Sequence, residues 1–374
     1  MGLLKAVIVG GGIAGCSTAY YLAQLGHDVT LIERDSVAFH ASGFAQGALN
    51  PVIRGSRQIE YQKFSDFSIG LHRQLAFDLS GHSSNEKYSN LNQKASVLLV
   101  KDEFQATAAK RIYESYLDDT DVDCRWLGLG ELSHIDARIS EDVVGGLYLG
   151  GAYDLDPYKF TLAIWQAAES LGANLVNLAV EGIAIKDGLA IGVRTSDLII
   201  PADVVVIAAG PWTGGILNEC GIFVPVSPLR GQILRLDAPD PPLKISFWWD
   251  KDYATSKPDG LVWVGTTEEN VGFDAQTTEK ARDLIIDSAI KMLPFLSQAK
   301  VVKQTACLRP MTPDNMPIID SELNVDGLVI ASGGGRQGIA LGPAIGISAA
   351  ALVTGSEPPI DISGFSLSRF SDSK

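Results

Sequence analysis

The N-terminal part of the chain alternates between two patterns of apolar residues. Residues 4–9 form a short apolar run rich in β-branched side chains, and residues 13–25 then carry apolar side chains at helical spacing until Gly26 interrupts them. Residues 28–32 (DVTLI) form a second run that is typical of a strand. This order predicts a βαβ unit, the repeat from which doubly wound parallel sheets are built.

Similar patterns later in the chain predict that this α/β domain is discontinuous. Residues 158–171 predict a helix, and residues 202–208 (ADVVVIA) predict an apolar strand. The segments between are more polar and mixed, and they predict a second, α+β domain on a mainly antiparallel sheet. The expected boundaries are 1–85, 148–222 and 303–374 for the first domain, and 86–147 and 223–302 for the second.

Two apolar segments resemble membrane or export signals. Residues 338–355 form an uncharged run of 18 residues, close to the shortest length that crosses a membrane. Their Gly and Pro content, and the lack of basic or aromatic anchors on both sides, predict a buried helix instead. Residues 5–16 have the form of a lipoprotein signal that ends at Cys16, but the motif described below explains them better. We therefore expect no membrane association.

Size and charge narrow the class of protein. A length of 374 residues suits two domains of roughly 150 residues each, with room for a cleft between them. A hydrophobic content of 46% is typical of a well-folded chain. The net charge of −14, without a long basic run, argues against a nucleic-acid partner because phosphate binding needs a basic surface.

The spacing of cysteines and histidines argues against disulfides and metals. No CxxC pair occurs, so we expect neither a zinc site nor a disulfide framework, and a reducing cytoplasm is the simplest location. The histidines lack metal-ligand spacing, and we expect no bound metal. The cysteines are Cys16, Cys124, Cys220 and Cys307.

A glycine-rich motif directly follows the first predicted strand. Residues 10–15 (GGGIAG) fit G-x-G-x-x-G, and Glu33 ends the second strand 18 residues beyond Gly15. Gly10 permits a tight turn, Gly12 lets the backbone approach a pyrophosphate, and Gly15 lets the helix pack against the sheet. The helix N-terminus offers N–H groups to phosphates, and Glu33 is placed to accept hydrogen bonds from ribose hydroxyls. The motif predicts a dinucleotide site and leaves FAD and NAD open.

Further motifs resemble those of the D-amino acid oxidase, glycine oxidase and sarcosine oxidase superfamily. They stand in family order and span nearly the whole chain: residues 33–34 (ER), 41–47 (ASGFAQG), 202–212 (ADVVVIAAGPW), 228–232 (PLRGQ), 308–310 (LRP) and 333–339 (GGGRQGI). The resemblance implies FAD as the cofactor, a Rossmann-type FAD-binding domain (GR2-like) and a second, substrate-binding domain. It implies oxidation of the C–N bond of a small amino acid or N-substituted glycine, by hydride transfer to flavin N5 to give an imine that hydrolyses.

The resemblance also implies which residues contact FAD. The segment 42–47 is expected beside the ribityl chain and the flavin ring, and the late glycine-rich turn at the pyrimidine side of the ring. The helix that begins at Gly338 is expected to stabilise negative charge on the reduced flavin. The implied cofactor-binding residues are Gly10, Gly12, Ile13, Ala14, Gly15, Glu33, Arg34, Ala41, Ser42, Gly43, Gln46, Gly47, Val180, Ala209, Gly210, Trp212, Gly334, Gly335, Gln337, Gly338 and Ile339.

Three residues are implied in the reaction itself. Arg309 corresponds to the arginine that clamps the substrate carboxylate, a role that suits the planar guanidinium fork; a structural salt bridge is the alternative. Arg336 is similar to a second arginine of glycine oxidases, with an ordinary surface arginine as the alternative. Tyr253 aligns with a tyrosine whose hydroxyl helps to bind the carboxylate, with a cross-strand aromatic as the alternative. We expect no general base, because a water-poor pocket suffices to favour the neutral amine.

Two positions depart from the family pattern. Cys307 falls where monomeric sarcosine oxidases carry the cysteine bonded to the flavin, which leaves a covalent flavin and a small buried thiol as alternatives. Trp263 stands where sarcosine oxidases carry an oxygen-activating lysine. The electron acceptor, oxygen or another compound, therefore stays open.

Other functions also stay open. Residues 41–43 and 46–51 are similar to the oxidase module of the bifunctional enzyme that modifies the tRNA wobble uridine, a module that acts on a carboxymethylaminomethyl-type amine. An NAD-dependent dehydrogenase of another family and a flavoprotein that only transfers electrons are further alternatives. The expected partners are a small amine or amino acid and an electron acceptor, and a homo-oligomer stays open.

Overall fold

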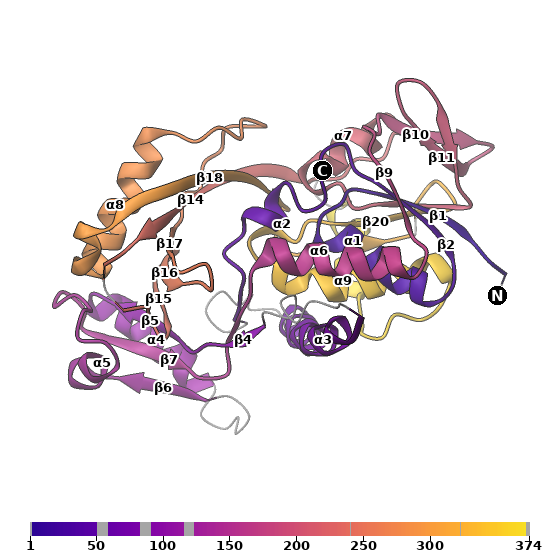
Figure 1. Cartoon of the computed structure of the whole chain (residues 1–374). Helices are drawn as coiled ribbons and strands as arrows, with labels where there is room; N and C mark the ends of the chain where they lie inside the picture. Colours follow the sequence, from indigo (N-terminus) through magenta and orange to yellow (C-terminus); the bar gives the residue numbers. More distant parts are fainter. Residues whose placement is uncertain are drawn as a thin grey trace.

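The computed structural model describes residues 2–50, 59–82, 91–115, 123–239, 241–321 and 323–371. They form two lobes, which we name the parallel lobe and the antiparallel lobe after the main sheet of each (Figure 1). Pro51, which ends the segment compared above with the tRNA-modifying module, lies outside the described residues.

The parallel lobe is built on a six-stranded sheet in the order β19-β20-β13-β1-β2-β9. Its strands are β1 (Lys5–Val9), β2 (Asp28–Ile32), β9 (Asn174–Val176), β13 (Val204–Ile207), β19 (Ile318–Asp320) and β20 (Leu328–Ser332). Within this sheet β1 pairs in parallel with β2 and β13, whereas β19 runs antiparallel to β20. Both faces are buried, which explains why the strands are continuous apolar runs. The predicted Rossmann-type βαβ unit is confirmed.

Helices cover one face of this sheet, and α9 packs closely against α1 (Figure 1). The helices on this side of the sheet are α1 (Ile13–Gln24), α6 (Pro157–Ser170) and α9 (Gly338–Thr354), and α3 (Ile59–His82) packs against α9 and α6. A Cβ added at Gly342 would lie 2.3 Å from the Ile13 side chain, and one at Gly346 would lie 2.3 Å from the Ser17 Cβ. Only glycine therefore lets the two helices approach this closely.

The opposite face of the sheet is covered by a smaller layer. A three-stranded sheet and a short helix contribute to the apolar core there, together with β1 and β13. The elements of this layer are β10 (Gly182–Lys186), β11 (Leu189–Arg194), β12 (Ile199–Pro201) and α7 (Thr213–Asn218).

The uncharged C-terminal run forms a core helix. In the described part of the chain, one helical stretch, Gly335–Thr354, is long and apolar enough to cross a membrane. Of its most apolar window, 72% is buried inside the protein, mainly by α1, α3 and the central strands. The prediction of a buried helix is confirmed.

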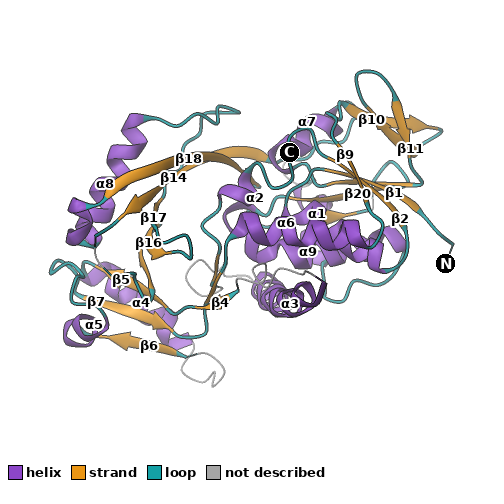
Figure 2. Ribbon diagram, in the orientation of Figure 1, coloured by secondary structure: helices purple, strands orange, loops and turns teal. Residues whose placement is uncertain are grey.

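The antiparallel lobe is built on an eight-stranded sheet in the order β18-β14-β17-β16-β15-β5-β7-β6 (Figure 2). The strands are β5 (Ser96–Val100), β6 (Cys124–Leu127), β7 (Gly145–Leu149), β14 (Ser227–Asp237), β15 (Ser246–Trp249), β16 (Asp252–Ser256), β17 (Val262–Gly265) and β18 (Lys300–Met311). Only the pairing of β15 with β5 is parallel within this sheet, so the predicted mainly antiparallel sheet is confirmed. Its helices are α4 (Glu103–Ser115), α5 (Leu129–Ile135) and α8 (Glu279–Met292).

The two lobes interleave along the chain, and the domain boundaries given above stay a prediction. The strands of the antiparallel lobe come from residues 96–149 and 227–311. A further small sheet has the order β3-β8-β4. The remaining elements are α2 (Ala41–Phe44), β3 (Ala48–Leu49), β4 (Asn92–Gln93), β8 (Tyr153–Asp154), η1 (Gly210–Trp212), η2 (Pro294–Gln298), η3 (Gly335–Gln337), η4 (Ser363–Phe365) and η5 (Leu367–Phe370).

A buried histidine fixes the first turn of α9. His72, on α3, is fully buried, and its Nε2 lies 2.9 Å from the carbonyl oxygen of Ile339. Its ring stacks on Phe160 with centroids 4.8 Å apart. Burial lowers the pKa of His72 to about 4, so the imidazole is neutral and donates its Nε2 hydrogen to the carbonyl.

This histidine predicts a pH-dependent stability. The folded-state pKa of about 4 lies below the ordinary value of 6.5, so the unfolded chain binds the proton first as the pH falls. The stability contributed by neutral His72 is fully present above about pH 6.5, and it is lost progressively as the pH falls towards 4. Between about pH 7.5 and about pH 5.5, we expect wild type to lose roughly 1 kcal/mol more free energy of unfolding than His72→Gln.

Glutamine is the suitable comparison because it keeps an N–H donor for the Ile339 carbonyl and does not titrate. Urea unfolding of both proteins at the two pH values measures the difference. Parallel pH dependence of the two proteins would contradict the prediction.

Candidate active site

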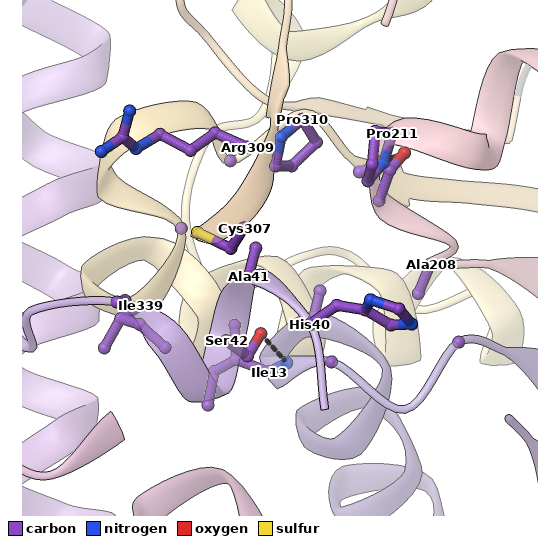
Figure 3. A pocket seen from close by; sticks show the side chains of 18 of the residues that line it. Ile13, His40, Ala41, Ser42, Ala208, Pro211, Cys307, Arg309, Pro310 and Ile339 are labelled. Atoms are coloured by element: carbon purple, nitrogen blue, oxygen red, sulfur yellow. Dashed lines mark hydrogen bonds between the residues drawn. The ribbon is translucent and has the colours of Figure 1, made fainter. Parts of the chain in front are cut away.

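A cavity of about 390 Å³ lies between the two lobes (Figure 3). Its wall on the parallel lobe comes from the glycine-rich turn before α1, from α2 and from the turn before α9. Its wall on the antiparallel lobe comes from β14, β15, β16 and β18. The implied cofactor residues that line it are Gly10, Gly12, Ile13, Ala14, Glu33, Arg34, Ala41, Ser42, Gln46, Gly47, Val180, Ala209, Gly210, Trp212, Gly334, Gly335, Gln337, Gly338 and Ile339.

Two of the implied residues, Gly15 and Gly43, lie behind the cavity wall and not on it. A Cβ at Gly15 would lie 1.9 Å from the Gly10 carbonyl oxygen, and one at Gly43 would lie 2.0 Å from the Ala38 carbonyl oxygen. These glycines therefore let the backbone segments of the wall pack together. Gly10 itself has a φ of +110°, which other residues rarely adopt.

The N-termini of two helices open on the same cavity. At α1, the backbone N–H of Ile13 donates to Ser42 Oγ at 2.9 Å, the bond drawn in Figure 3. At α9, the preceding residue Gln337 is held by Tyr61, whose hydroxyl donates to its Oε1 at 2.7 Å. Neither α1 nor α9 has a side-chain hydrogen bond from its N-cap residue. Two positive dipole ends thus meet one cavity, an arrangement that suits an anionic ligand.

Glu33 is fixed at the edge of the cavity by backbone donors. The N–H of Gly11 donates to its Oε2 at 2.7 Å, and the N–H of Asp35 donates to its Oε1 at 2.9 Å. A carboxylate has about four acceptor positions, so both oxygens can still accept from hydroxyl groups. Beside it, the guanidinium of Arg34 lies 4.0 Å from the centre of the Trp212 ring, in a cation–π contact.

The guanidinium of Arg309, on β18, lies flat against β14. Its Nη2 donates to Thr266 Oγ1 at 2.7 Å, and its Nη1 donates to the Thr267 carbonyl at 3.1 Å. A Cβ at Gly231 would lie 2.3 Å from the guanidinium carbon, so only glycine leaves room for it. Guanidinium has five N–H donors, and these two bonds leave three for a ligand.

Three arginines of the described residues line the cavity, and they differ in their counter-ions. Arg34 pairs with Asp35 at 3.1 Å. Arg336 donates to both carboxylate oxygens of Glu268, at 2.6 and 2.8 Å, and to Asn315 Oδ1 at 2.8 Å. Arg309 has no carboxylate partner among the residues that the structure describes.

The pairing of Arg336 bears on its predicted role. The residue reaches the cavity as expected, but the protein itself supplies the carboxylate that its guanidinium binds. Hydrogen bonds to Glu268 raise the pKa of Arg336, so the guanidinium stays protonated. The Glu268 carboxylate neutralises its positive charge. Of these two arginines, Arg309 is thus the one whose charge no carboxylate of the described residues neutralises.

Tyr253 is a cross-strand aromatic that also lines the cavity. It is 3% exposed, lines the cavity, and packs against Trp248 with ring centroids 5.2 Å apart. Gly265 faces it in the sheet register, where a Cβ would lie 3.1 Å from the Tyr253 hydroxyl oxygen. Trp263, by contrast, is buried outside the cavity wall, and its Nε1 donates to Asp259 at 2.9 Å.

Cys307 lines the cavity two residues before Arg309 on β18 (Figure 3). It is 8% exposed, and burial raises the pKa of its thiol, although nearby Arg309 acts in the opposite direction. The thiol form is therefore favoured over the nucleophilic thiolate.

Several residues of this wall are not predicted from the sequence. Thr266, Ile233 and Trp248 line the cavity, and nothing in the local sequence distinguishes them. The sequence does contain a signal for Gly231, which stands between Arg230 and Gln232 in the motif 228–232. Successive residues of a strand point to opposite faces, so the glycine lies on the face opposite to these two long polar side chains.

Comparisons with known proteins agree with this architecture. The "Bifunctional protein ThiO/ThiG" of Nostoc sp. is 29% identical over 97% of the chain, which spans only 54% of that relative. The crystal structure of glycine oxidase from Geobacillus kaustophilus superposes with a TM-score of 0.92 at 26% identity, covering 99% of each chain. That of iminodiacetate oxidase from Chelativorans sp. superposes with a TM-score of 0.89 at 26% identity, covering 97% of this chain and 98% of that one.

The family model described as FAD dependent oxidoreductase (DAO) matches residues 5–352, which include both lobes and every residue of the cavity wall. The glycine-rich turn, the paired helix N-termini and the fixed Glu33 are consistent with that cofactor. This chain therefore belongs to the family of FAD-dependent oxidoreductases.

Proposed function

We propose that this enzyme oxidises the C–N bond of a small amino acid or N-substituted glycine. The observation that carries the proposal is that Arg309 is the cavity-lining arginine for which the described chain supplies no carboxylate. A cation without a counter-ion between two protein walls favours an anionic ligand, because burying an uncompensated charge is costly. The names of the solved relatives, a glycine oxidase and an iminodiacetate oxidase, support the same substrate class.

FAD is the cofactor, and when bound it supplies the two-electron oxidant. We propose that the N-terminus of α1 holds its phosphates and that Glu33 accepts hydrogen bonds from its adenosine ribose. The segment 41–47 and the turn 333–339 would contact the flavin ring. Support for this fit comes from the glycines of the wall, where side chains would collide with neighbouring backbone, and from the N-terminus of α9, which favours negative charge.

The protein's own part in the reaction is to bind and orient the substrate. Arg309 would accept the carboxylate in its planar fork, while Thr266, Thr267 and Gly231 hold the guanidinium in place. Trp248 and Tyr253 present buried aromatic surface at the same end of the cavity. Such a wall excludes water and disfavours the ammonium form of the substrate, and the amine must be neutral to react.

Two general properties complete the proposal. Members of the family act on small molecules and pass electrons to an acceptor, which we leave open between oxygen and another compound. All four cysteines are free thiols, and this supports a reducing, cytoplasmic location.

The main test concerns Arg309. Replacing it with Lys keeps the charge but removes the fork, and replacing it with Met removes both. Losing a charge-assisted contact costs about 1.5–3 kcal/mol, so the efficiency of anaerobic flavin reduction by glycine or sarcosine should fall by roughly one to two decades. We expect the larger loss for Met, because substrate misplacement adds to it.

Two controls define this test. Reduction by methylamine, which lacks the carboxylate, should change little in either variant, and flavin content should match wild type. If Arg309→Met slows every substrate equally, or unfolds the protein, then Arg309 is structural and the amino-acid proposal loses its support.

A second prediction concerns cofactor binding. A Cβ at Gly12 would already lie 3.1 Å from Ser42 Oγ, and a branched side chain there would stand in front of the α1 N-terminus. Gly12→Val should therefore lose most of its FAD, measured as the ratio of flavin to protein absorbance. Gly70→Val is the matched control, because Gly70 lies on the exposed side of α3 with open space around it. Full flavin occupancy in Gly12→Val would refute the assignment.

A third prediction concerns the bond between flavin and protein. Because the Cys307 thiol is buried and its pKa is raised, we expect the flavin to be bound non-covalently. Acid precipitation should then release the yellow colour into the supernatant. Colour that stays with the precipitate in wild type, but not in Cys307→Ser, would establish a covalent flavin instead.

A further inference from the structure

One loop contacts both arginines that the family resemblance implies in the reaction. Thr266 and Thr267 accept hydrogen bonds from Arg309, and the next residue, Glu268, pairs with Arg336. The turn that carries Arg336 also adjoins the strand that carries Arg309, since a Cβ at Gly335 would lie 3.9 Å from the Pro310 carbonyl oxygen. The two guanidinium groups therefore belong to the same end of the cavity.

Their surroundings differ in charge. Arg309 is met by a hydroxyl and a carbonyl, which carry no net charge, so its positive charge remains for a ligand. Arg336 is met by a carboxylate on two of its nitrogens and by an amide oxygen on the third. Within the part of the chain that the structure describes, the end of the cavity thus offers one positive charge that no carboxylate neutralises, although two arginines line it.

We propose that Glu268 determines substrate specificity by occupying Arg336, so that the site accepts amines with one carboxylate and discriminates against those with two. This proposal rests on the proposed function. A second carboxylate would have to displace Glu268 from a bidentate pair and would leave that glutamate facing a like charge. Specificity built from such a repulsive group is removed when the group is neutralised.

The test uses two ligands that cannot release hydride from an amine carbon. Thiodiglycolate carries two carboxylates, and (methylthio)acetate is its counterpart with one. Dissociation constants are measured with the FAD-loaded enzyme, from the change of the flavin absorbance spectrum on titration. Wild type should bind (methylthio)acetate more tightly than thiodiglycolate. In Glu268→Gln, the ratio of affinities should shift towards thiodiglycolate by roughly tenfold or more, the size expected for one charge-assisted contact.

Other charged residues supply the controls. Glu219→Gln removes a carboxylate that pairs with Arg194 and lies outside the cavity wall, and it should leave the ratio at the wild-type value. Glu268→Asp keeps the charge and should stay near wild type. When Glu268→Gln is combined with Arg336→Gln, the shift of the affinity ratio towards thiodiglycolate should disappear. If Glu268→Gln loses its flavin, Glu268→Ala gives the same comparison.

The outcomes separate this proposal from the proposed function. An unchanged ratio in Glu268→Gln and Glu268→Ala, an equal shift in Glu219→Gln, or no binding of either ligand to any variant overturns it. Failure of glycine, sarcosine and D-alanine to reduce the wild-type flavin would overturn the proposed function, while the ligand ratio would still decide the role of Glu268. If both proposals hold, Glu268→Gln should also be reduced by iminodiacetate more efficiently, relative to glycine, than wild type.

Discussion

The register of the β14–β18 pair is the constraint on which the active site depends. These two long antiparallel strands extend from the antiparallel lobe to η1, η3 and α2 at the parallel lobe (Figure 1). Their register sets Gly231 opposite Cys307 and Leu229 opposite Arg309. A slip of one residue would exchange the two faces of a strand, placing the side chain of Arg230 or Gln232 where the Arg309 guanidinium now lies. Backbone pairing between β14 and β18 therefore sets where the Arg309 guanidinium lies, independently of its side-chain contacts.

The opposite face of β14 holds the loop that completes the site. Arg230 is 4% exposed and pairs with Glu269 at 2.7 Å and with Asp274 at 2.6 Å. Glu269 in turn accepts from the Thr267 hydroxyl at 2.6 Å, which ties this network to the loop beside Arg309. A buried charge is tolerated only when its donors are satisfied, and removal of one partner is strongly destabilising. The network thus ties the loop to β14, so the strand that leaves room for Arg309 also positions the residues that hold it.

Local features of this fold could be predicted from sequence, whereas features set by distant contacts could not. The βαβ unit, the glycine-rich turn and the buried nature of α9 follow from apolar spacing and from the backbone freedom of glycine. The partner of Arg309, Thr266, lies 43 residues away, and that of Arg336, Glu268, lies 68 residues away. An isolated arginine does not reveal whether the fold gives it a counter-ion. The family resemblance pointed to both arginines, and both line the cavity. Only the structure shows that Glu268 pairs with Arg336 and that the described residues give Arg309 no carboxylate.

Helix packing explains why the cavity suits an anionic cofactor as well as an anionic substrate. Because Gly342 and Gly346 lie against Ile13 and Ser17, α9 approaches α1 closely, and both helices begin at the same cavity. Larger side chains at these glycines would push the helices apart and separate their N-termini. Each N-terminus carries a partial positive charge that acts only over about the first turn. Two such charges can act on one extended ligand only when both helices begin at the same place. Gly342 and Gly346, although buried between the helices, therefore affect the electrostatics of the cavity.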